Sequence, residues 1–216
     1  MFICDWSYGK LYAVHLKPNG STYQGELEEF VAGTPLPLTD VVVGAKDGAL
    51  YFTIGGRRTK SGLYRVTYQG NESTVHSISV DPGVAARAKR RSLEALHKPM
   101  GLDAVKLSTP ELGNSDRLTR YAARVALEHQ PPNLWQAAVL DSPDVGIALN
   151  GMLAMTRVSS NEFRSAILKK LYSIPFDGLT ETEQILWLRV YGLIFMRLGG
   201  AEAEDAEQIR NRLEPQ

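Results

Sequence analysis

The sequence predicts an α+β chain in two segments, an antiparallel β segment followed by an array of α-helices. Three observations support this prediction. Apolar and polar residues alternate with period two over the first 80 residues, a repeat lies within that stretch, and a helical period begins after the Asp81-Pro82-Gly83 turn. We therefore expect a partial β domain over 1–80, a linker helix within 81–100 and a helical repeat domain over 101–216.

Short strands are expected in the first segment because turn residues interrupt the alternation every few positions. Pro18-Asn19-Gly20 and Lys46-Asp47-Gly48 both end in a glycine, which supplies the positive φ of a tight hairpin. The expected strands cover residues 2–5, 10–16, 23–31, 39–44, 49–54, 62–68 and 73–79.

The first segment repeats itself at an offset of about 52 residues. The runs LYFT (50–53) and GLYRV (62–66) match FICD (2–5) and KLYAV (10–14). A repeat of four short strands over about 40 to 50 residues is typical of a β-propeller blade. The first copy lacks the strand that precedes the second, so we expect the chain to begin inside a blade and to be a fragment, since so few blades cannot close a ring.

Helix pairs are expected beyond the turn. A helix over 84–97 comes first, and Thr180 followed by Glu183 is a capping box that marks a later helix start. Ser115-Asp116 and Ser142-Pro143-Asp144 offer further capping oxygens. The other expected helices cover 102–112, 116–129, 132–140, 144–158, 161–173, 181–198 and 202–213.

Small residues recur at the centre of one helix in each of three successive pairs: Ala126, Ala154 and Gly192. Small side chains allow helices to cross closely. The pattern predicts a HEAT-like α-solenoid, in which each helix pair buries its apolar face on the next, with a generic helical bundle as the alternative.

Composition excludes several classes of function. The chain has 24 basic and 24 acidic residues, so its net charge is zero and no global field favours nucleic acid. The longest apolar stretch, 185–198, is interrupted by Arg189 and Arg197 and is too short for membrane insertion. A single cysteine, Cys4, excludes an internal disulfide, and the first ten residues do not resemble a signal peptide.

Three residues of the β segment are candidates for ligand binding. Asp40 begins the innermost strand of the complete blade, where propeller residues face the central channel, and it is equally interpretable as a turn-capping aspartate. Arg57 and Arg58 lie in a hairpin and could bind a carboxylate or phosphate through their guanidinium groups. Solvated loop charges are the simpler interpretation of both.

Other chemistry-bearing residues favour structural roles. Cys4 is expected to be a small core residue, and Trp135, Trp187 and Tyr191 are expected in the helical core. The basic residues of 84–97 (Arg87, Lys89, Arg90, Arg91) indicate a solvated face more than a docking patch. The sequence has no nucleophile elbow or phosphate loop, and its histidines lack metal-ligand spacing: His15, His76, His97 and His129.

Two stretches resemble known families. PLPLTDVVV (35–43), KDGALYFTIGGR (46–57) and SGLYRVTY (61–68) resemble the terminal blades of quinoprotein sugar dehydrogenases of the glucose and sorbosone type. LGNSDRLTRYAARVALEH (112–129) resembles a HEAT repeat. In this order they look like the propeller plus HEAT proteins of planctomycete-type bacteria, which commonly end in a cytochrome c domain.

The resemblance implies a periplasmic or other extracytoplasmic parent that oxidises carbohydrate with pyrroloquinoline quinone (PQQ) and haem c. This chain departs from that pattern, because it has no C-x-x-C-H haem motif and lacks most of the blades that would surround the quinone. We therefore expect no cofactor in this chain itself.

The expected function is that of a non-catalytic fragment of such a protein. Its helical array would act as a scaffold or protein-binding surface, with a protein partner or the rest of the parent propeller as its partner. The alternative is a stand-alone interaction module whose small β-sheet packs on the helical repeats.

Overall fold

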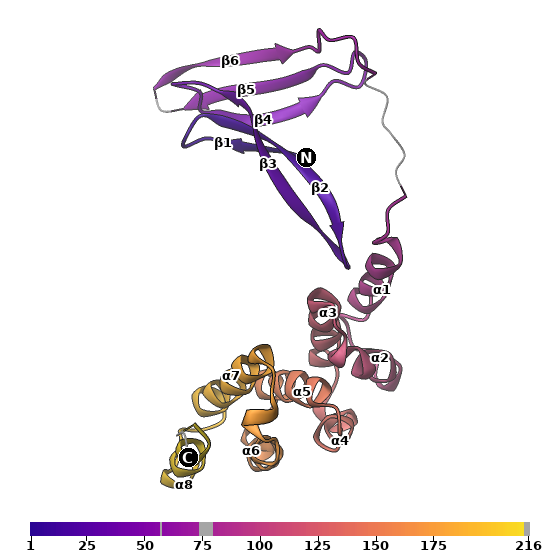
Figure 1. The fold of residues 1–216 in the computed structure, drawn as a ribbon, viewed down its shortest axis with the longest axis vertical. Coiled ribbons are helices and arrows are strands. Elements are labelled where there is room, and N and C mark those ends of the chain that lie inside the picture. Colours follow the sequence, from indigo (N-terminus) through magenta and orange to yellow (C-terminus); the bar gives the residue numbers. More distant parts are fainter. Residues whose placement is uncertain (57, 74–79, 214–216) are drawn as a thin grey trace. The chain divides into compact units, whose positions relative to one another are not determined.

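The computed structural model describes residues 1–56, 58–73 and 80–213. It divides into two compact units, Met1–Gly83 and Val84–Gln216 (Figure 1). The first contains two antiparallel three-stranded sheets and the second contains helices, so the expected α+β class with strands preceding helices is confirmed.

Two hairpin-built sheets make up the β unit. The first sheet has the order β1-β2-β3, and the second has the order β4-β5-β6. The seventh expected strand, 73–79, falls almost entirely outside the described residues. The strand bounds are β1 Phe2–Asp5, β2 Lys10–Asn19, β3 Thr22–Ala32, β4 Leu38–Val43, β5 Leu50–Gly56 and β6 Thr59–Val66.

The two sheets pack against each other, with β1 beside β4. The core between them is small and apolar, and its buried members are Leu11, Leu38, Leu50, Phe52 and Ile54. Phe52 stacks on Tyr64 of the neighbouring strand, with ring centroids 4.9 Å apart. These apolar contacts exclude water from one face of each sheet.

Strand pairing shifts the internal repeat by one residue from the sequence match. Cys4 pairs with Leu11 in β1–β2, and Thr53 pairs with Leu63 in β5–β6, so the match of Leu11 with Leu63 aligns Cys4 with Thr53. The sequence repeat matches both Cys4 to Phe52 and Leu11 to Leu63, and these two matches differ by one residue in the strand pairing, because Phe52 pairs with Tyr64. Because successive side chains in a strand point to opposite faces, this one-residue difference reverses the face assigned to every residue of that strand.

The helical unit contains eight α-helices in the described residues. Short 3₁₀ turns, labelled η1 to η4, occupy parts of several stretches expected to be α-helical. The first of them, η1, covers Thr109–Gly113. The bounds are α1 Val84–Glu94, α2 Leu102–Ser108, α3 Arg117–Glu128, α4 Gln136–Leu140, α5 Val145–Val158, α6 Arg164–Ser173, α7 Glu181–Arg197 and α8 Ala203–Leu213.

The helices form successive pairs. α3 packs on α2, α5 on α4 and α7 on α6. One member of each pair also stacks on the next, so α1, α3, α5 and α7 follow one another in a single layer. The helix expected as a linker therefore lies within the helical unit, because α1 packs on α3.

The expected helix starts are confirmed. Asp116 and Asp144 each accept a hydrogen bond from the backbone N–H three residues on, and Thr180 and Glu183 form the capping box. The expected core positions are also confirmed, since Trp135, Trp187 and Tyr191 are buried.

Of the three small residues expected at helix crossings, Ala126 and Ala154 are fully buried. Gly192 is exposed, so the expectation is wrong there. The close approach is made instead at Gly151, which lies against Val139 of α4. In the described part of the chain, no helix is long and apolar enough to span a membrane.

Candidate functional site

Asp40 lies in β4, at an irregularity in the pairing with β5. Its side chain is exposed, and one carboxylate oxygen accepts a hydrogen bond of 2.8 Å from the N–H of Val41. Asp40 also lies close enough to Cys4 for its charge to act on that thiol. Its neighbourhood thus contains one carboxylate and one thiol.

The pKa of the Cys4 thiol is raised, chiefly by burial and further by the negative charge of Asp40. A thiol with a raised pKa is largely protonated at neutral pH, and the protonated form is a poor nucleophile and a poor metal ligand. This arrangement agrees with Cys4 as a packing residue, and the side chain does contact the sheet core.

The second candidate group, Arg57 and Arg58, occupies the turn between β5 and β6. Arg57 lies outside the described residues. Arg58 is exposed and adopts a φ of 60°, a left-handed conformation that few non-glycine residues take. Among the described residues no hydrogen bond or ion pair joins Arg58 to Asp40, so the structure does not assemble these candidates into one site.

The basic residues of α1 are largely engaged within the chain. Arg87 is buried, and Lys89 and Arg90 pair with glutamates of η1 and α1. Arg91 remains exposed. These contacts account for the basic cluster without an external partner.

The histidines do not converge. His15 contacts Glu28 on the exposed hairpin, His76 lies outside the described residues, and His97 stacks on His129 with ring centroids 6.0 Å apart. Within the described ranges, no group of three or more histidine, cysteine or acidic residues could hold a metal ion.

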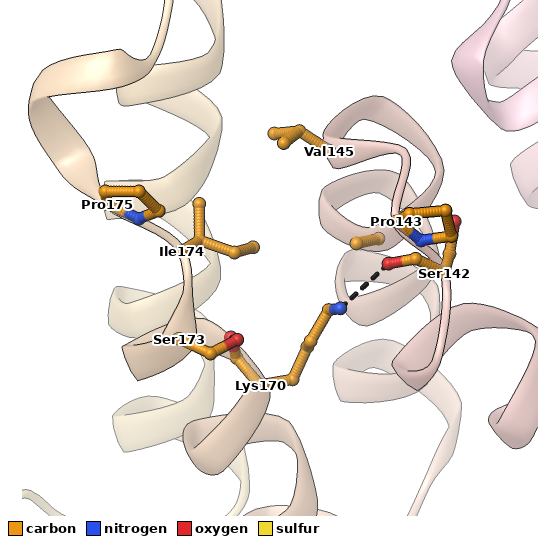
Figure 2. A pocket seen from close by; sticks show the side chains of 8 residues that line it. Ser142, Pro143, Val145, Lys170, Ser173, Ile174 and Pro175 are labelled. Carbon is orange, nitrogen blue, oxygen red and sulfur yellow. Dashed lines mark hydrogen bonds between the residues drawn. The ribbon is translucent and has the colours of Figure 1, made fainter.

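A pocket of about 180 Å³ lies between the loop that precedes α5 and the end of α6 (Figure 2). Lys170 reaches across it and donates a hydrogen bond of 2.8 Å to the carbonyl of Ser142. The Ser173 hydroxyl binds the carbonyl of Lys170, and that of Ser142 accepts from the N–H of Asp144. The polar groups therefore bind the chain itself, and the pocket joins two helix pairs.

Sequence reasoning missed this pocket, since its two sides come from different helix pairs. It also missed a leucine that lies exposed on the outward face of the second sheet. Leu11 is 0% exposed in the core between the sheets, whereas the equivalent Leu63 is 70% exposed on the outward face of the second sheet. The match between Leu11 and Leu63 in the repeat is the sequence signal for this face. A leucine that is buried in one copy of a repeat predicts that the matched leucine of the other copy is also covered.

Comparisons with protein-family models, with curated proteins and with solved structures find no match to this chain.

Proposed function

We propose that this chain is a non-catalytic part of a larger β-propeller protein. In this proposal the two sheets are blade-like units that pack against further sheets, and the helical array is a HEAT-like scaffold and protein-binding surface. The observation that carries the proposal is the unequal exposure of Leu11 and Leu63, two residues that the sequence repeat aligns.

Propeller blades pack so that one face of each sheet meets the opposite face of the next. The face of the first sheet that carries Leu11 packs on the face of the second sheet that carries Phe52, and this contact supports the proposal. The face of the second sheet that carries Leu63 is the equivalent of the first covered face, and it is open. A further sheet placed there would bury Leu63 as Leu11 is buried.

The proposed parent is a quinoprotein sugar dehydrogenase-like propeller with HEAT repeats in an extracytoplasmic compartment. The resemblance of residues 35–68 and 112–129 supports this assignment. In such a parent, PQQ and haem c would be bound by parts other than this chain, and the helical array would connect the propeller to a protein partner.

Light scattering coupled to size-exclusion chromatography tests the proposal on the intact chain. We expect self-association that increases with concentration, because another copy would cover the exposed Leu63 and Val42 of this face when their natural cover is missing. Leu63→Glu should shift the population toward monomer. The matched control is Leu107→Glu, which places the same charge at an exposed leucine of α2 and should change nothing.

Two results would overturn the proposal. One is a wild-type chain that stays monomeric at every concentration, which would mean that the β unit needs no further cover. The other is an equal effect of Leu63→Glu and Leu107→Glu, which would mean that association does not use this face.

A further inference from the structure

Three arginines gather on the layer formed by α3, α5 and α7, one from each helix: Arg124, Arg157 and Arg189. Arg124 and Arg157 both pair with the same carboxylate, Glu128. The pKa of Arg124 is lowered, first by burial of its guanidinium and then by the positive charges of Arg157 and Arg189, against the opposing effect of Glu128. Arg189 therefore lies within electrostatic reach of the pair.

The charges in this cluster do not balance. Two guanidinium groups, those of Arg124 and Arg157, pair with one carboxylate, and Arg189 of the neighbouring helix α7 adds a third positive charge, so two positive charges are uncompensated. Arg157 has a side chain that is 46% exposed, and Arg189 is exposed. In the described part of the chain, Glu128 is the carboxylate partner of Arg157, and Arg189 forms no ion pair.

The cluster is also held in place. Arg197, in the last turn of α7, donates hydrogen bonds to the carbonyls of Thr156 and Arg157, which ties the ends of α5 and α7 together. Glu128 does the same for α3 and α5 by pairing with Arg157. A positively charged surface on rigid, packed helices loses little conformational entropy when it binds.

Exposed apolar side chains border the charges. The guanidinium of Arg124 lies 5.0 Å from the ring centre of Tyr121, whose side chain is 56% exposed. Ile185 stands one turn before Arg189 on the same face of α7 and is 60% exposed. A surface that combines arginine, tyrosine and aliphatic side chains has the composition of a protein interface.

We propose that this surface, the arginine face (Tyr121, Arg124, Arg157, Ile185 and Arg189), binds an acidic segment of a protein partner. Carboxylates of the segment would pair with Arg157 and Arg189, and its apolar side chains would pack on Tyr121 and Ile185. This inference rests on the proposed role of the helical array as a protein-binding surface and specifies the chemistry of its partner.

A nucleic acid fits the arginine face less well. Binding to a phosphate backbone gains its affinity from many neutralised phosphates, whereas this face offers two uncompensated charges on a chain of zero net charge. A phosphate backbone also offers no apolar surface on which the bordering side chains could pack.

Fluorescence anisotropy of the intact chain with a labelled synthetic peptide of alternating glutamate and leucine tests the inference. We expect binding at low salt that weakens as salt is added, because screening shortens the range of the charges. Arg157→Glu and Arg189→Glu should each weaken binding by about tenfold or more, since each turns an attraction into a repulsion.

The matched control is Lys169→Glu, which makes the same change of charge at an exposed residue of α6, in the other helix layer, and should leave binding unchanged. A peptide of alternating lysine and leucine should not bind. The inference is overturned if the acidic peptide does not bind at low salt, if Lys169→Glu weakens it as much as Arg189→Glu, or if single-stranded DNA of equal charge binds more tightly.

The two proposals fail in different ways. Arg157→Glu and Arg189→Glu should not alter self-association through the sheets, and Leu63→Glu should not alter peptide binding. A chain that binds the acidic peptide but stays monomeric would disprove the blade assignment and support the proposal that the arginine face binds an acidic segment.

Discussion

Two glycines of the helical unit occupy opposite environments. A Cβ added to Gly151 would lie 2.4 Å from both methyl groups of Val139, so α4 and α5 approach more closely there than any side chain allows. A Cβ added to Gly192 would meet nothing within 4 Å. The same substitution at these two positions therefore separates the effect of packing from that of helix propensity.

Gly151→Ala should lower the free energy of unfolding by about 1–3 kcal/mol, because the added methyl forces the two helices apart. Gly192→Ala should raise it by up to about 1 kcal/mol, because alanine favours the helix and the space is open. Urea unfolding followed by circular dichroism measures both. Equal stabilities of the two variants would contradict the close approach of α4 and α5.

The sequence located these small residues only in part. Ala126 lies on the apolar side of α3, and Ala154 lies on α5, which is buried on nearly all sides, so both are buried as expected. α7 carries apolar residues around its whole circumference, including exposed Ile185 and Met196, so periodicity alone could not show that Gly192 faces outward.

At the scale of whole elements, a buried carboxylate helps to join α8 to the array, together with Arg212, which donates hydrogen bonds to the carbonyls of Tyr172 and Ile174. Asp205 accepts hydrogen bonds from the guanidinium of Arg164 at 2.6 Å, the hydroxyl of Tyr172 at 2.7 Å and the N–H of Glu202 at 3.0 Å. Burial acts to raise the pKa of Asp205, but these hydrogen bonds outweigh it and hold the pKa below its usual value. The folded helix thus favours the charged carboxylate.

Asp205→Asn should lower the free energy of unfolding at neutral pH by about 1–3 kcal/mol, because Arg164 loses its charged partner. A pKa that is depressed in the folded state stabilises above the unfolded value of about 3.9, and that contribution is lost as the pH falls through the folded pKa. The difference between wild type and Asp205→Asn should therefore shrink below about pH 4.

Urea titrations at a series of pH values measure this difference. Glu207→Gln, at an exposed position of the same helix, is the control and should show no comparable effect. A gap between wild type and Asp205→Asn that persists unchanged at acid pH would contradict the role of the ionised carboxylate.

Strand and helix positions could be predicted from the sequence because turn glycines, caps and periodicity are local signals. The register of the strands could not be predicted from the sequence. The match between LYFT and FICD follows residue similarity, whereas the pairing is fixed by backbone hydrogen bonds such as that from the N–H of Val14 to the carbonyl of Met1. A bulge between Ile54 and Gly56 further separates the two hairpins.

At the scale of the whole molecule, the two units differ in how completely they bury their apolar residues. The helical unit encloses a large core that includes Trp135 and Trp187. The β unit has a small core and leaves Leu63 outside it. The arginine face also belongs to this scale, because helix stacking brings together arginines that are far apart in sequence, which no local motif predicts.

The central proposal is that a further sheet covers the outward face of the second sheet, whereas the helical unit has a large buried core of its own. Hydrogen exchange of the intact chain, followed by mass spectrometry, tests it most directly. The account predicts that amides of β4, β5 and β6 exchange through an opening that leaves α3, α5 and α7 protected. Equal protection of the sheets and the helices, lost in a single cooperative step, would contradict it.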